Sequence, residues 1–450
     1  MSGTGFVDVL TQPAGAHSTS VPGLGTFYAS PAIGSDGTVY LGTLEGKVIA
    51  LHADGTPYWN RELPPASREH ILTPIAVGAD QSAYVVGVHR DAAVADHRAA
   101  AGSSRVVTYR ATLYKFTAGG GAPVGNSTSI PDLQPGVAPG QFGPSFVGEP
   151  AVWQFGADQA VIVPVGYSTL TSAELHVLAF SPDGGVMADV TVGRWNVGDV
   201  TGRGEFWEGL REDVGLAFEP APVYSYDESD PTSSPIPGVS IFTNPRGGTP
   251  FITVIDPLQR DIVSYTFCVG AACSPAPGFT ERVRTGVPGN PLLSGPVTLP
   301  DLHSAVGTDD GVAFGGPSQT SAPAVTGLGS VFATPTPSVG DRVVLVNIDG
   351  TAAVMKDHAI ISRISLGSPS IARAVASRTH VFVATRDGFH TLDALAQSEV
   401  LNFPWTGGGV LSPAIGPDGR VYAMALNTLF IFPPPPPGHG VFHPRPISFS

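Results

Sequence analysis

The chain has 450 residues, of which 42% are hydrophobic and only 13% charged, a composition that excludes a disordered polymer and supports a large buried core. The formal charge of −14 repels phosphate backbones, so we expect no nucleic-acid partner. No apolar run reaches the roughly 18–20 residues that a membrane-spanning helix needs, so no transmembrane segment is expected.

The remaining composition predicts short strands joined by turns. The chain holds 56 Gly and 44 Pro, which are turn formers, beside many Val, Thr and Ile residues, which favour strands. The first ten residues, MSGTGFVDVL, lack the basic and apolar regions of a secretory leader. By this criterion the protein is either cytoplasmic or recorded without its leader.

The first predicted module is SPAIGSDGTVYLGTLEGKVIALHADGTPYW, residues 30–59, in which three apolar runs are separated by Asp-Gly or Glu-Gly pairs. A proline at the start of the first strand costs the sheet little, because the hydrogen-bond ladder is only beginning there. Recurrence of such a module indicates a repeat architecture. Eight candidate modules begin at Pro31, Pro74, Pro150, Pro222, Pro296, Pro337, Pro369 and Pro413.

An acidic residue followed by Gly separates the second and third predicted strands of several modules. Asp-Gly suits a type I′ turn, whose two central residues need positive φ. We therefore expect tight hairpins with this turn at Glu45-Gly46, Asp310-Gly311, Asp349-Gly350 and Asp387-Gly388.

Such sheets have two apolar faces, which neighbouring sheets cover when all are arranged radially. We predict an all-β, eight-bladed β-propeller of four-stranded antiparallel sheets over residues 1–432, with seven blades as the alternative. The last module, SPAIGPDGRVYAMALNTLFIF, lacks a fourth strand. We expect residues 6–13 to supply it and close the ring, which removes an exposed edge. We expect residues 433–450 to form a Pro-rich tail, which is either an extended polyproline II spacer or a disordered end.

Three long inserts interrupt the predicted blades, at residues 89–105, 119–147 and 193–217. In a propeller, the connection from the second to the third strand and the connection to the next blade open on one rim. All three inserts are therefore predicted on the rim of blades 2–4. Because loops longer than about 12–15 residues are usually functional or disordered, we expect the binding surface there.

Two of these inserts carry the candidate site residues. The first, HRDAAVADHR, groups histidines and aspartates that suit a metal site, an acid–base pair or merely a solvated loop. The third combines aromatic residues with arginines, which are usual anchors of a recognition surface, although an amphipathic helix packed on the ring fits equally. The candidate rim residues are His89, Asp91, His97, Arg194, Trp195, Arg203, Phe206, Trp207 and Arg211.

The chain has two cysteines, Cys268 and Cys273, in the stretch FCVGAACSP. A hairpin at this stretch could bring their Cα atoms within the ~4.4–6.8 Å that a disulfide requires. The pair is either a structural disulfide, which would indicate an oxidising compartment, or two free thiols near a strand end.

The module at residues 30–59 resembles the repeat of the PQQ-type, quinoprotein-like β-propellers, and the module at residues 412–432 resembles it equally. The resemblance implies an eight-bladed ring, in agreement with the proline count. One branch of this family consists of dehydrogenases that bind pyrroloquinoline quinone and calcium against an adjacent cysteine pair and a Trp. The other branch consists of non-catalytic scaffolds and binding proteins, including an assembly protein of bacterial envelopes.

The sequence departs from the dehydrogenase branch at several positions. Cys268 and Cys273 are not adjacent. The family motif that locks blades together, with Ala, Asp, Gly-Lys and a closing Trp, survives in fragments: His52 replaces the Asp before Trp59, and Asp393 is kept without the Gly-Lys. The resemblance therefore implies the non-catalytic branch and no cofactor.

We predict a non-enzymatic, monomeric binding or scaffold module. It would bind a protein or glycan partner through the rim of blades 2–4, outside the cytoplasm of a bacterium, in the periplasm, lipid-anchored or secreted. One alternative is a divergent oxidoreductase that uses pyrroloquinoline quinone and calcium, which cofactor absorbance and dye reduction would reveal. The other is a carbohydrate-active hydrolase, which needs two carboxylates ~5–10 Å apart.

Overall fold

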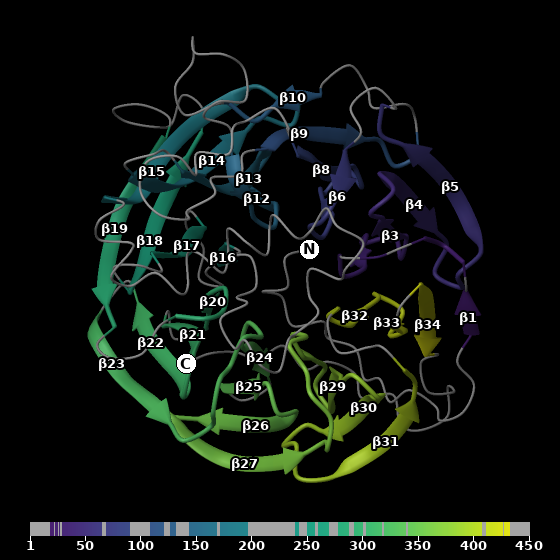
Figure 1. Ribbon diagram of the computed structural model, residues 1–450, viewed down its shortest axis with the longest axis vertical. Helices are drawn as coiled ribbons and strands as arrows, with labels where there is room; N and C mark the ends of the chain where they lie inside the picture. Colours follow the sequence, from purple (N-terminus) through teal and green to yellow (C-terminus); the bar gives the residue numbers. More distant parts are fainter. Residues whose placement is uncertain are drawn as a thin grey trace, which may run out of the picture.

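The structure is a computed structural model of the chain. It describes residues 19–21, 23–25, 27, 29–64, 69–90, 109–120, 127–131, 144–168, 172–196, 239–242, 250–256, 260–269, 278–287, 292–299, 303–316, 319–338, 341–406, 411–425 and 427–432. Over these ranges the regular secondary structure is entirely β. The strands form eight antiparallel sheets that stand radially around a central axis (Figure 1). The predicted eight-bladed β-propeller is confirmed.

The blades follow one another in chain order, and within each blade the strands run from the axis outward. Blade 1 consists of β2 (Ala32–Ile33), β3 (Val39–Gly42), β4 (Lys47–Leu51) and β5 (Pro57–Glu62). Blade 2 consists of β6 (His70–Ile71) and β7 (Ala76–Val77), which share the innermost position, then β8 (Ala83–Arg90), β9 (Tyr109–Phe116) and β10 (Thr128–Ser129). Blade 3 consists of β11 (Pro144–Val147) and β12 (Ala151–Phe155), then β13 (Asp158–Ser168), β14 (Ser172–Phe180) and β15 (Val186–Asn196). Blade 4 consists of β16 (Ser240–Phe242), β17 (Phe251–Asp256), β18 (Asp261–Cys268) and β19 (Gly278–Gly286).

The second half of the ring is built the same way. Blade 5 consists of β20 (Val297–Thr298), β21 (Ser304–Thr308), β22 (Gly311–Gly316) and β23 (Gln319–Thr326). Blade 6 consists of β24 (Thr336–Ser338), β25 (Arg342–Val346), β26 (Thr351–Lys356) and β27 (Ala359–Ser365). Blade 7 consists of β28 (Val375–Ala376), β29 (His380–Ala384), β30 (Gly388–Asp393) and β31 (Glu399–Pro404). Blade 8 consists of β32 (Ala414–Ile415), β33 (Val421–Ala425) and β34 (Thr428–Phe432), and β1 (Thr19–Val21) completes it.

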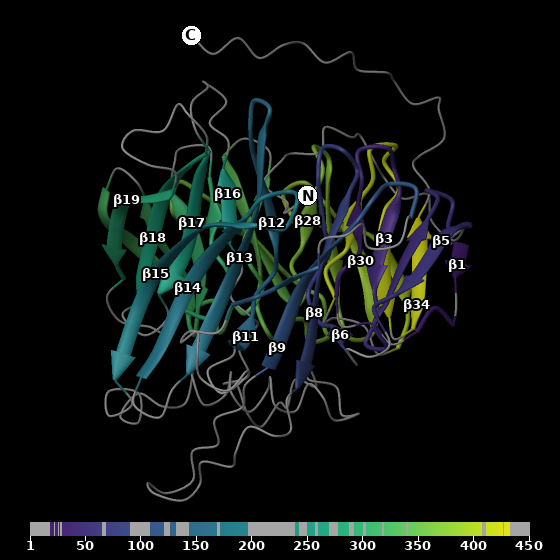
Figure 2. The same cartoon turned by 90° about the horizontal axis from the view of Figure 1, so that it is seen from above.

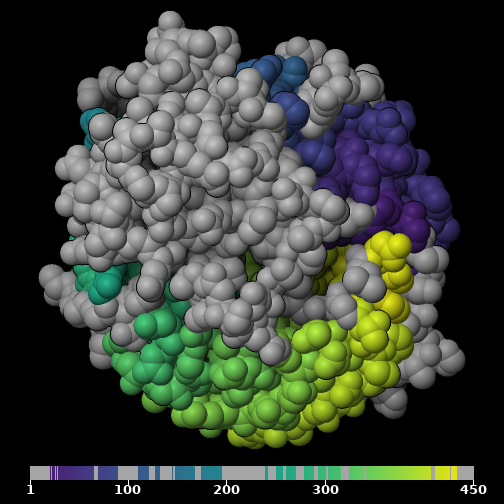
Figure 3. Space-filling model, in the orientation of Figure 1, coloured from purple at the N-terminus to yellow at the C-terminus, as the bar shows by residue number. Residues whose placement is uncertain are grey.

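The two ends of the described chain meet in blade 8. Strand β1 pairs with β34 in antiparallel register, with Thr19 opposite Ile431 and Val21 opposite Leu429. An N-terminal strand thus closes the ring as predicted, but its predicted position was wrong: residues 6–13 lie outside the described ranges, and Thr19–Val21 occupies the edge. In Figure 3 the last blade, in yellow, lies directly against the first, in purple.

The repeated Ser-Pro phrase of the first and last modules has a structural role at this closure. The backbone N–H of Ser412 donates to the hydroxyl of Ser30 at 2.9 Å, which joins blade 8 to blade 1 near the axis. The hydroxyl of Tyr422 donates to the carbonyl of Ala53 at 2.9 Å and joins the same two blades farther out. Blade 1 contacts blade 2 through a tyrosine at the same strand position, since the Tyr40 hydroxyl donates to the Gln81 carbonyl, in the turn between β7 and β8, at 3.0 Å.

The acidic-Gly pairs do form hairpin turns, but the predicted type I′ geometry was wrong. At Glu45-Gly46 and Asp349-Gly350 only the glycine has positive φ, +74° and +75°. The N–H of Gly46 donates to the Thr43 carbonyl at 3.0 Å, which is a type I turn followed by a left-handed glycine. A side chain is excluded there as well, since a Cβ on Gly350 would lie 1.8 Å from the Ser368 carbonyl oxygen.

The hydrophobic core lies between neighbouring blades rather than in one centre. Each core cluster draws on facing sheets; in one of them, Phe389 of blade 7 stacks on Phe432 of blade 8 with ring centroids 4.3 Å apart. Strands β21 and β33 are buried along their whole length, because both of their faces are covered. This is the mutual protection of two-faced sheets that the repeat predicts.

The outermost strands of several blades carry β-bulges. The register shifts at Tyr58 in β5, Ile361 in β27 and Val400 in β31, and these extra residues are 45%, 45% and 40% exposed. A bulge bends the open edge of a sheet and disrupts its ladder, which hinders pairing with another chain. Blade 3 has a further bulge at Val192, which bears on the site.

Candidate functional site

The strands of blades 2 and 3 extend toward one end of the ring, at the bottom of Figure 2. Strands β13 and β15 have 11 residues each, whereas β3 of blade 1 has four. Strand ends at Arg90, Tyr109, Ser168, Ser172 and Asn196 lie on this side, which we call the insertion face. The predicted inserts at 89–105 and 193–217 leave the described strands from this face.

The second predicted insert, 119–147, is only partly a connection to the next blade. It contains β10, the fourth strand of blade 2, and β11, which opens blade 3. This insert is thus not one continuous loop, because it contains two short strands that were not recognised in the sequence. Its residues 121–126 and 132–143 lie outside the described ranges.

The structure describes three of the nine predicted rim residues. His89 lies half-buried near the end of β8, and Arg194 is exposed near the end of β15, both toward the insertion face. Trp195 is part of β15 and pairs with Ala173 through its backbone. The other six lie outside the described ranges: Asp91, His97, Arg203, Phe206, Trp207 and Arg211. Among the residues that are described, no cluster of three or more His, Cys, Asp or Glu could hold a metal ion.

A polar cluster of four side chains occupies the insertion-face end of β14 and β15. Glu174 and His176 are two residues apart on β14 and so share one face of the sheet. The Nε2 atom of His176 lies 3.2 Å from Glu174 Oε2, and its Nδ1 atom lies 2.9 Å from Asp189 Oδ1. The Nε atom of Arg194 donates to Glu174 Oε1 at 3.0 Å. Glu174 therefore ties an internal histidine to an arginine at the surface.

The burial of these groups is graded. His176 and Glu174 are 6% and 8% exposed, whereas the Arg194 side chain is 70% exposed. The ring of Tyr167 on β13 packs edge-on against His176, with centroids 5.1 Å apart. The Tyr167 hydroxyl donates to the Pro131 carbonyl at 2.8 Å and holds that ring in place. Arg194 is thus an exposed cation that is held by the buried side chain of Glu174, which His176 contacts in turn.

The geometry of His176 requires its charged form. Both ring nitrogens face carboxylate oxygens, and an ionised carboxylate only accepts hydrogen bonds, so both nitrogens must carry a proton. Burial alone would lower the pKa of His176, but the hydrogen bonds and charges of Asp189 and Glu174 outweigh it and raise the pKa above 6.5. The imidazolium is the central cation of the cluster.

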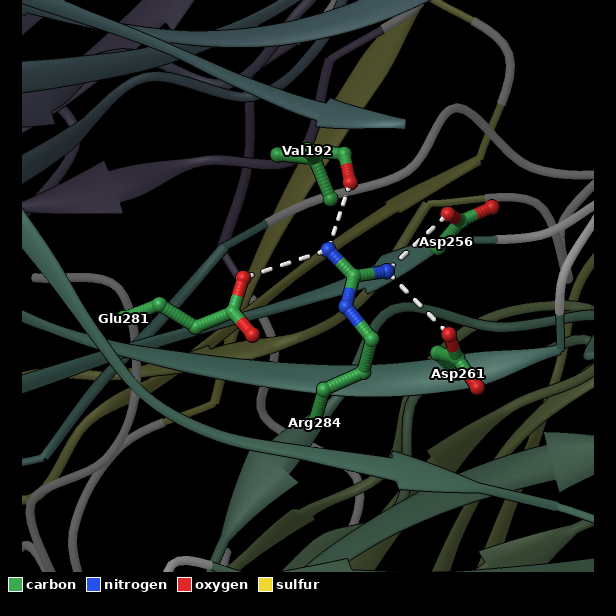
Figure 4. A network of polar contacts seen from close by, with 5 residues as sticks. All are labelled: Val192, Asp256, Asp261, Glu281 and Arg284. Atoms are coloured by element: carbon green, nitrogen blue, oxygen red, sulfur yellow. Dashed lines mark hydrogen bonds and ion pairs between the residues drawn. The ribbon is translucent and has the colours of Figure 1, made fainter. Parts of the chain in front are cut away.

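A second polar network joins blade 3 to blade 4 (Figure 4). The bulge at Val192 leaves its carbonyl outside the β14–β15 ladder, and Arg284 Nη2 on β19 donates to that oxygen at 2.7 Å. Arg284 Nη1 contacts Asp256 at 3.3 Å and Asp261 at 3.1 Å, and Nη2 contacts Glu281 at 3.3 Å. This network fixes the outer strand of blade 3 two residues from Arg194.

The bulge explains the position of the exposed arginine. Gly193 pairs with Leu175 and Thr191 with His176, so Val192 is an extra residue between them. As a result Arg194 stands opposite Glu174 in register. Without the bulge, the register would shift by one residue, and Gly193 rather than Arg194 would stand opposite Glu174. A bulge therefore aims Arg194 onto Glu174.

Sequence reasoning identified Arg194 but missed its supporting residues, Glu174, His176 and Asp189, and the Arg284 network. A signal was present in AELHVLAF, where two charged or titratable residues alternate within an otherwise apolar strand. The stretch DPLQRD, residues 256–261, likewise placed two aspartates at the ends of one turn. Neither pattern indicated which strand would face which.

Cys268 is the last residue of β18 and is bonded in a disulfide. Cys273, the other cysteine of the predicted pair, lies outside the described ranges. Strand β18 is the third strand of its blade from the axis. No helix in the described part has the length and apolarity that a membrane crossing demands.

No protein-family model and no curated protein matches the sequence. Among solved structures, the chain is similar to BamB from Moraxella catarrhalis, with 11% identity and a TM-score of 0.51, over 92% of this chain and 98% of that one. It is also similar to Sqt1 from Saccharomyces cerevisiae, with 9% identity and a TM-score of 0.57, over 95% of this chain and all of that one. These likenesses show the β-propeller fold.

Proposed function

We propose that the chain is a non-enzymatic binding or scaffold module that recognises a protein partner through the rim of blades 2–4. One observation carries the proposal: Arg194 is exposed on the insertion face while its Nε atom is held by the buried carboxylate of Glu174. Strands β8 and β15, from which two of the predicted inserts continue, end on the same face. Fold alone does not imply function, so the argument depends on this site.

An arginine held in this way is a good recognition residue. Its planar guanidinium can form paired hydrogen bonds with a carboxylate, and the contact with Glu174 uses only Nε of a side chain that is 70% exposed. Ordering a long side chain on binding costs about 0.5–1.5 kcal/mol, and part of that cost is already met in the free protein. Arginine and tryptophan are enriched at interface hot spots, which agrees with the Arg- and Trp-containing sequence that follows β15.

We further propose that the chain belongs to the non-catalytic branch of the PQQ-type propellers. The surviving Trp of the family motif supports this, because Trp59 Nε1 donates to the Ala118 carbonyl of blade 2 at 3.0 Å. A Cβ on Gly120 would lie 2.3 Å from the Trp59 ring, so the indole fits against a glycine of the next blade. Cys268 at the end of a third strand, rather than over the axis, argues against the dehydrogenase branch.

An extracytoplasmic location in a bacterium is part of the same proposal. The disulfide at Cys268 supports it, because disulfides persist in oxidising compartments and are rare in the cytosol. Fractionation of the native host, with detection of the full chain in periplasmic, membrane and secreted fractions, tests the location. A chain found only in the cytoplasm would contradict it.

Quantitative affinity capture from the native host tests the binding proposal, with the full chain in three forms. The wild type is compared with Arg194→Glu and with Arg363→Glu, a matched control at an exposed arginine on the outer strand of blade 6. We expect one protein to be captured by the wild type and the control and lost with Arg194→Glu. Equal capture by all three forms would contradict the proposal, as would binding that survives protease treatment of the extract.

The oxidoreductase alternative is tested on the purified chain. Pyrroloquinoline quinone and calcium are added, and absorbance of a bound cofactor and reduction of a dye are measured. We expect neither signal above a denatured control. Saturable cofactor binding with dye turnover would overturn the non-enzymatic assignment.

A further inference from the structure

The surroundings of His176 differ from those of a histidine buried only for packing. The charged and titratable groups that face it are Asp189 on β15 and Glu174 on its own strand, with Arg194 behind Glu174. From β13 it meets the ring of Tyr167, whose hydroxyl is bonded to the Pro131 carbonyl. Two anions and two cations thus form a chain that begins inside blade 3 and ends at the rim.

We propose that the imidazolium of His176 holds Glu174, and through it Arg194, in the partner-binding position, so that binding at this rim weakens when His176 loses its proton. This inference rests on the proposed function and adds its regulation. His176 is a positioning residue, since it does not reach the surface itself and acts through Glu174.

Loss of the proton has a direct geometric consequence. A neutral imidazole keeps one N–H, so one ring nitrogen presents a lone pair to a carboxylate oxygen 2.9 or 3.2 Å away. That contact becomes repulsive. Because Glu174 is buried, water is not at hand to replace the lost donor, and the carboxylate must move. That movement displaces the acceptor of Arg194 Nε.

The direction of the pH effect follows from the direction of the pKa shift. The pKa of His176 is raised above 6.5 in the folded protein, after the hydrogen bonds and charges of Asp189 and Glu174 outweigh the lowering effect of burial. The stabilisation is therefore complete below pH 6.5 and is lost as the pH rises through the folded pKa. We expect the rim to bind below pH 6.5 and to release its partner as the pH rises through the folded pKa of His176.

The chain contains a matched control histidine in blade 7. His390 also lies on a third strand, β30, and is 3% exposed. Its Nδ1 lies 2.5 Å from Glu399 Oε1, but its Nε2 lies 2.9 Å from the hydroxyl of Thr385. A hydroxyl can donate as well as accept, so His390 does not face two obligatory acceptors as His176 does. The same Thr385 hydroxyl also donates to the Gly388 carbonyl at 3.0 Å.

Nuclear magnetic resonance of the full chain, without any partner, tests whether the position of Arg194 depends on the protonation of His176. Side-chain ¹⁵N shifts of histidine are followed from about pH 5.5 to about pH 9, with signals assigned through His176→Gln and His390→Gln. We expect His176 to carry two protons at pH 6.5 and to titrate above it. The Nε–H signal of Arg194, assigned through Arg194→Lys, should broaden or vanish with the same midpoint. A neutral His176 at pH 6.5, or an Arg194 signal that ignores its titration, would overturn the inference.

A capture experiment separates this inference from the proposed function. The wild type should capture its partner about tenfold less well above the NMR midpoint of His176 than at about pH 6, a change that corresponds to about 1.4 kcal/mol. His176→Gln should bind equally at both pH values, and His390→Gln should behave like the wild type. If capture requires Arg194 but is the same at both pH values, the inference about His176 is refuted and the proposed function stands. Capture that does not need Arg194 refutes the proposed function.

Discussion

Two parts of the ring follow the same plan but differ in the length of their strands. Blades 6, 7, 8 and 1 have short middle strands, such as β25, β29 and β33 with five residues each, and their turns are short. Blade 3 has strands of 9 and 11 residues that extend past them on the insertion face. The repeat supplies a stable wall, and the departures from it carry the polar networks around His176 and Arg284. We therefore place the candidate binding site in blade 3, whose strands depart from the regular repeat.

The comparison is tested most strongly by removing a core aromatic from the regular half. Phe389→Ala should cost about 3–5 kcal/mol of unfolding free energy, because the ring is fully buried and stacked on Phe432. The control is Phe155→Ala in blade 3, where the ring is 44% exposed and the expected cost is under about 0.5 kcal/mol. Urea denaturation measures both. Similar costs would show that the regular half does not carry the stability.

The next prediction concerns the link between blades 3 and 4. Arg284→Ala should cost about 3 kcal/mol, since it removes the cation from Asp256, whose side chain is 1% exposed. Adding Asp256→Asn should recover part of that loss by removing the buried charge. The control is Arg363→Ala, an exposed arginine of blade 6, with a cost below about 1 kcal/mol. No recovery in the double variant would contradict a charge-based role.

The two buried histidines sharpen the comparison further. His176→Gln should cost about 1.5–3 kcal/mol below pH 6.5, because it removes hydrogen bonds between charged groups. The cost should shrink as the pH rises through the folded pKa, which the charges of Asp189 and Glu174 raise against the lowering effect of burial. Urea denaturation at several pH values measures it. His390→Gln is the comparison variant, and parallel profiles for the two variants would refute the distinction, because only His176 faces carboxylates at both ring nitrogens.

The smallest effects should be equal in both halves. The hydroxyl of Tyr422 bonds the Ala53 carbonyl of blade 1 at 2.9 Å, and that of Tyr167 bonds the Pro131 carbonyl at 2.8 Å. Tyr422→Phe and Tyr167→Phe each remove one neutral hydrogen bond, with an expected cost of about 0.5–1.5 kcal/mol. Thermal or urea unfolding detects this difference. A much larger cost for Tyr167→Phe would mean that it supports His176 through more than packing.

The propeller and its blade number could be predicted because the repeat is written in the sequence. The Ser-Pro phrase joins blades, and the turns at Glu45-Gly46 and Asp349-Gly350 need a glycine with positive φ and no side chain. The position of the closing strand could not be predicted, since β1 has three residues, Thr19–Val21, and gains its strand character from pairing with β34. Short strands of this kind have no periodicity to read.

Of the described candidate site, the sequence predicted the exposed Arg194 but not the buried residues that hold it. Arg194 was identified from its aromatic and charged neighbours, but its partner Glu174 depends on strand register. That register is set by the extra residue Val192, whose carbonyl is bound by Arg284 on another blade. Such long-range pairing leaves no local pattern. Six of the nine predicted rim residues lie outside the described ranges and stay predictions.

Site-specific photo-cross-linking in the native host tests most directly whether the insertion face of blade 3 meets the partner. A photoreactive residue is placed at Thr191, exposed on β15 opposite His176, and separately at Asn402, exposed on β31 opposite His390. Both positions are exposed, lie on the outermost strand of their blade and stand opposite a buried histidine. We predict a cross-link to one protein from Thr191 and none from Asn402. Equal cross-linking from both positions, or from Asn402 alone, would contradict the account.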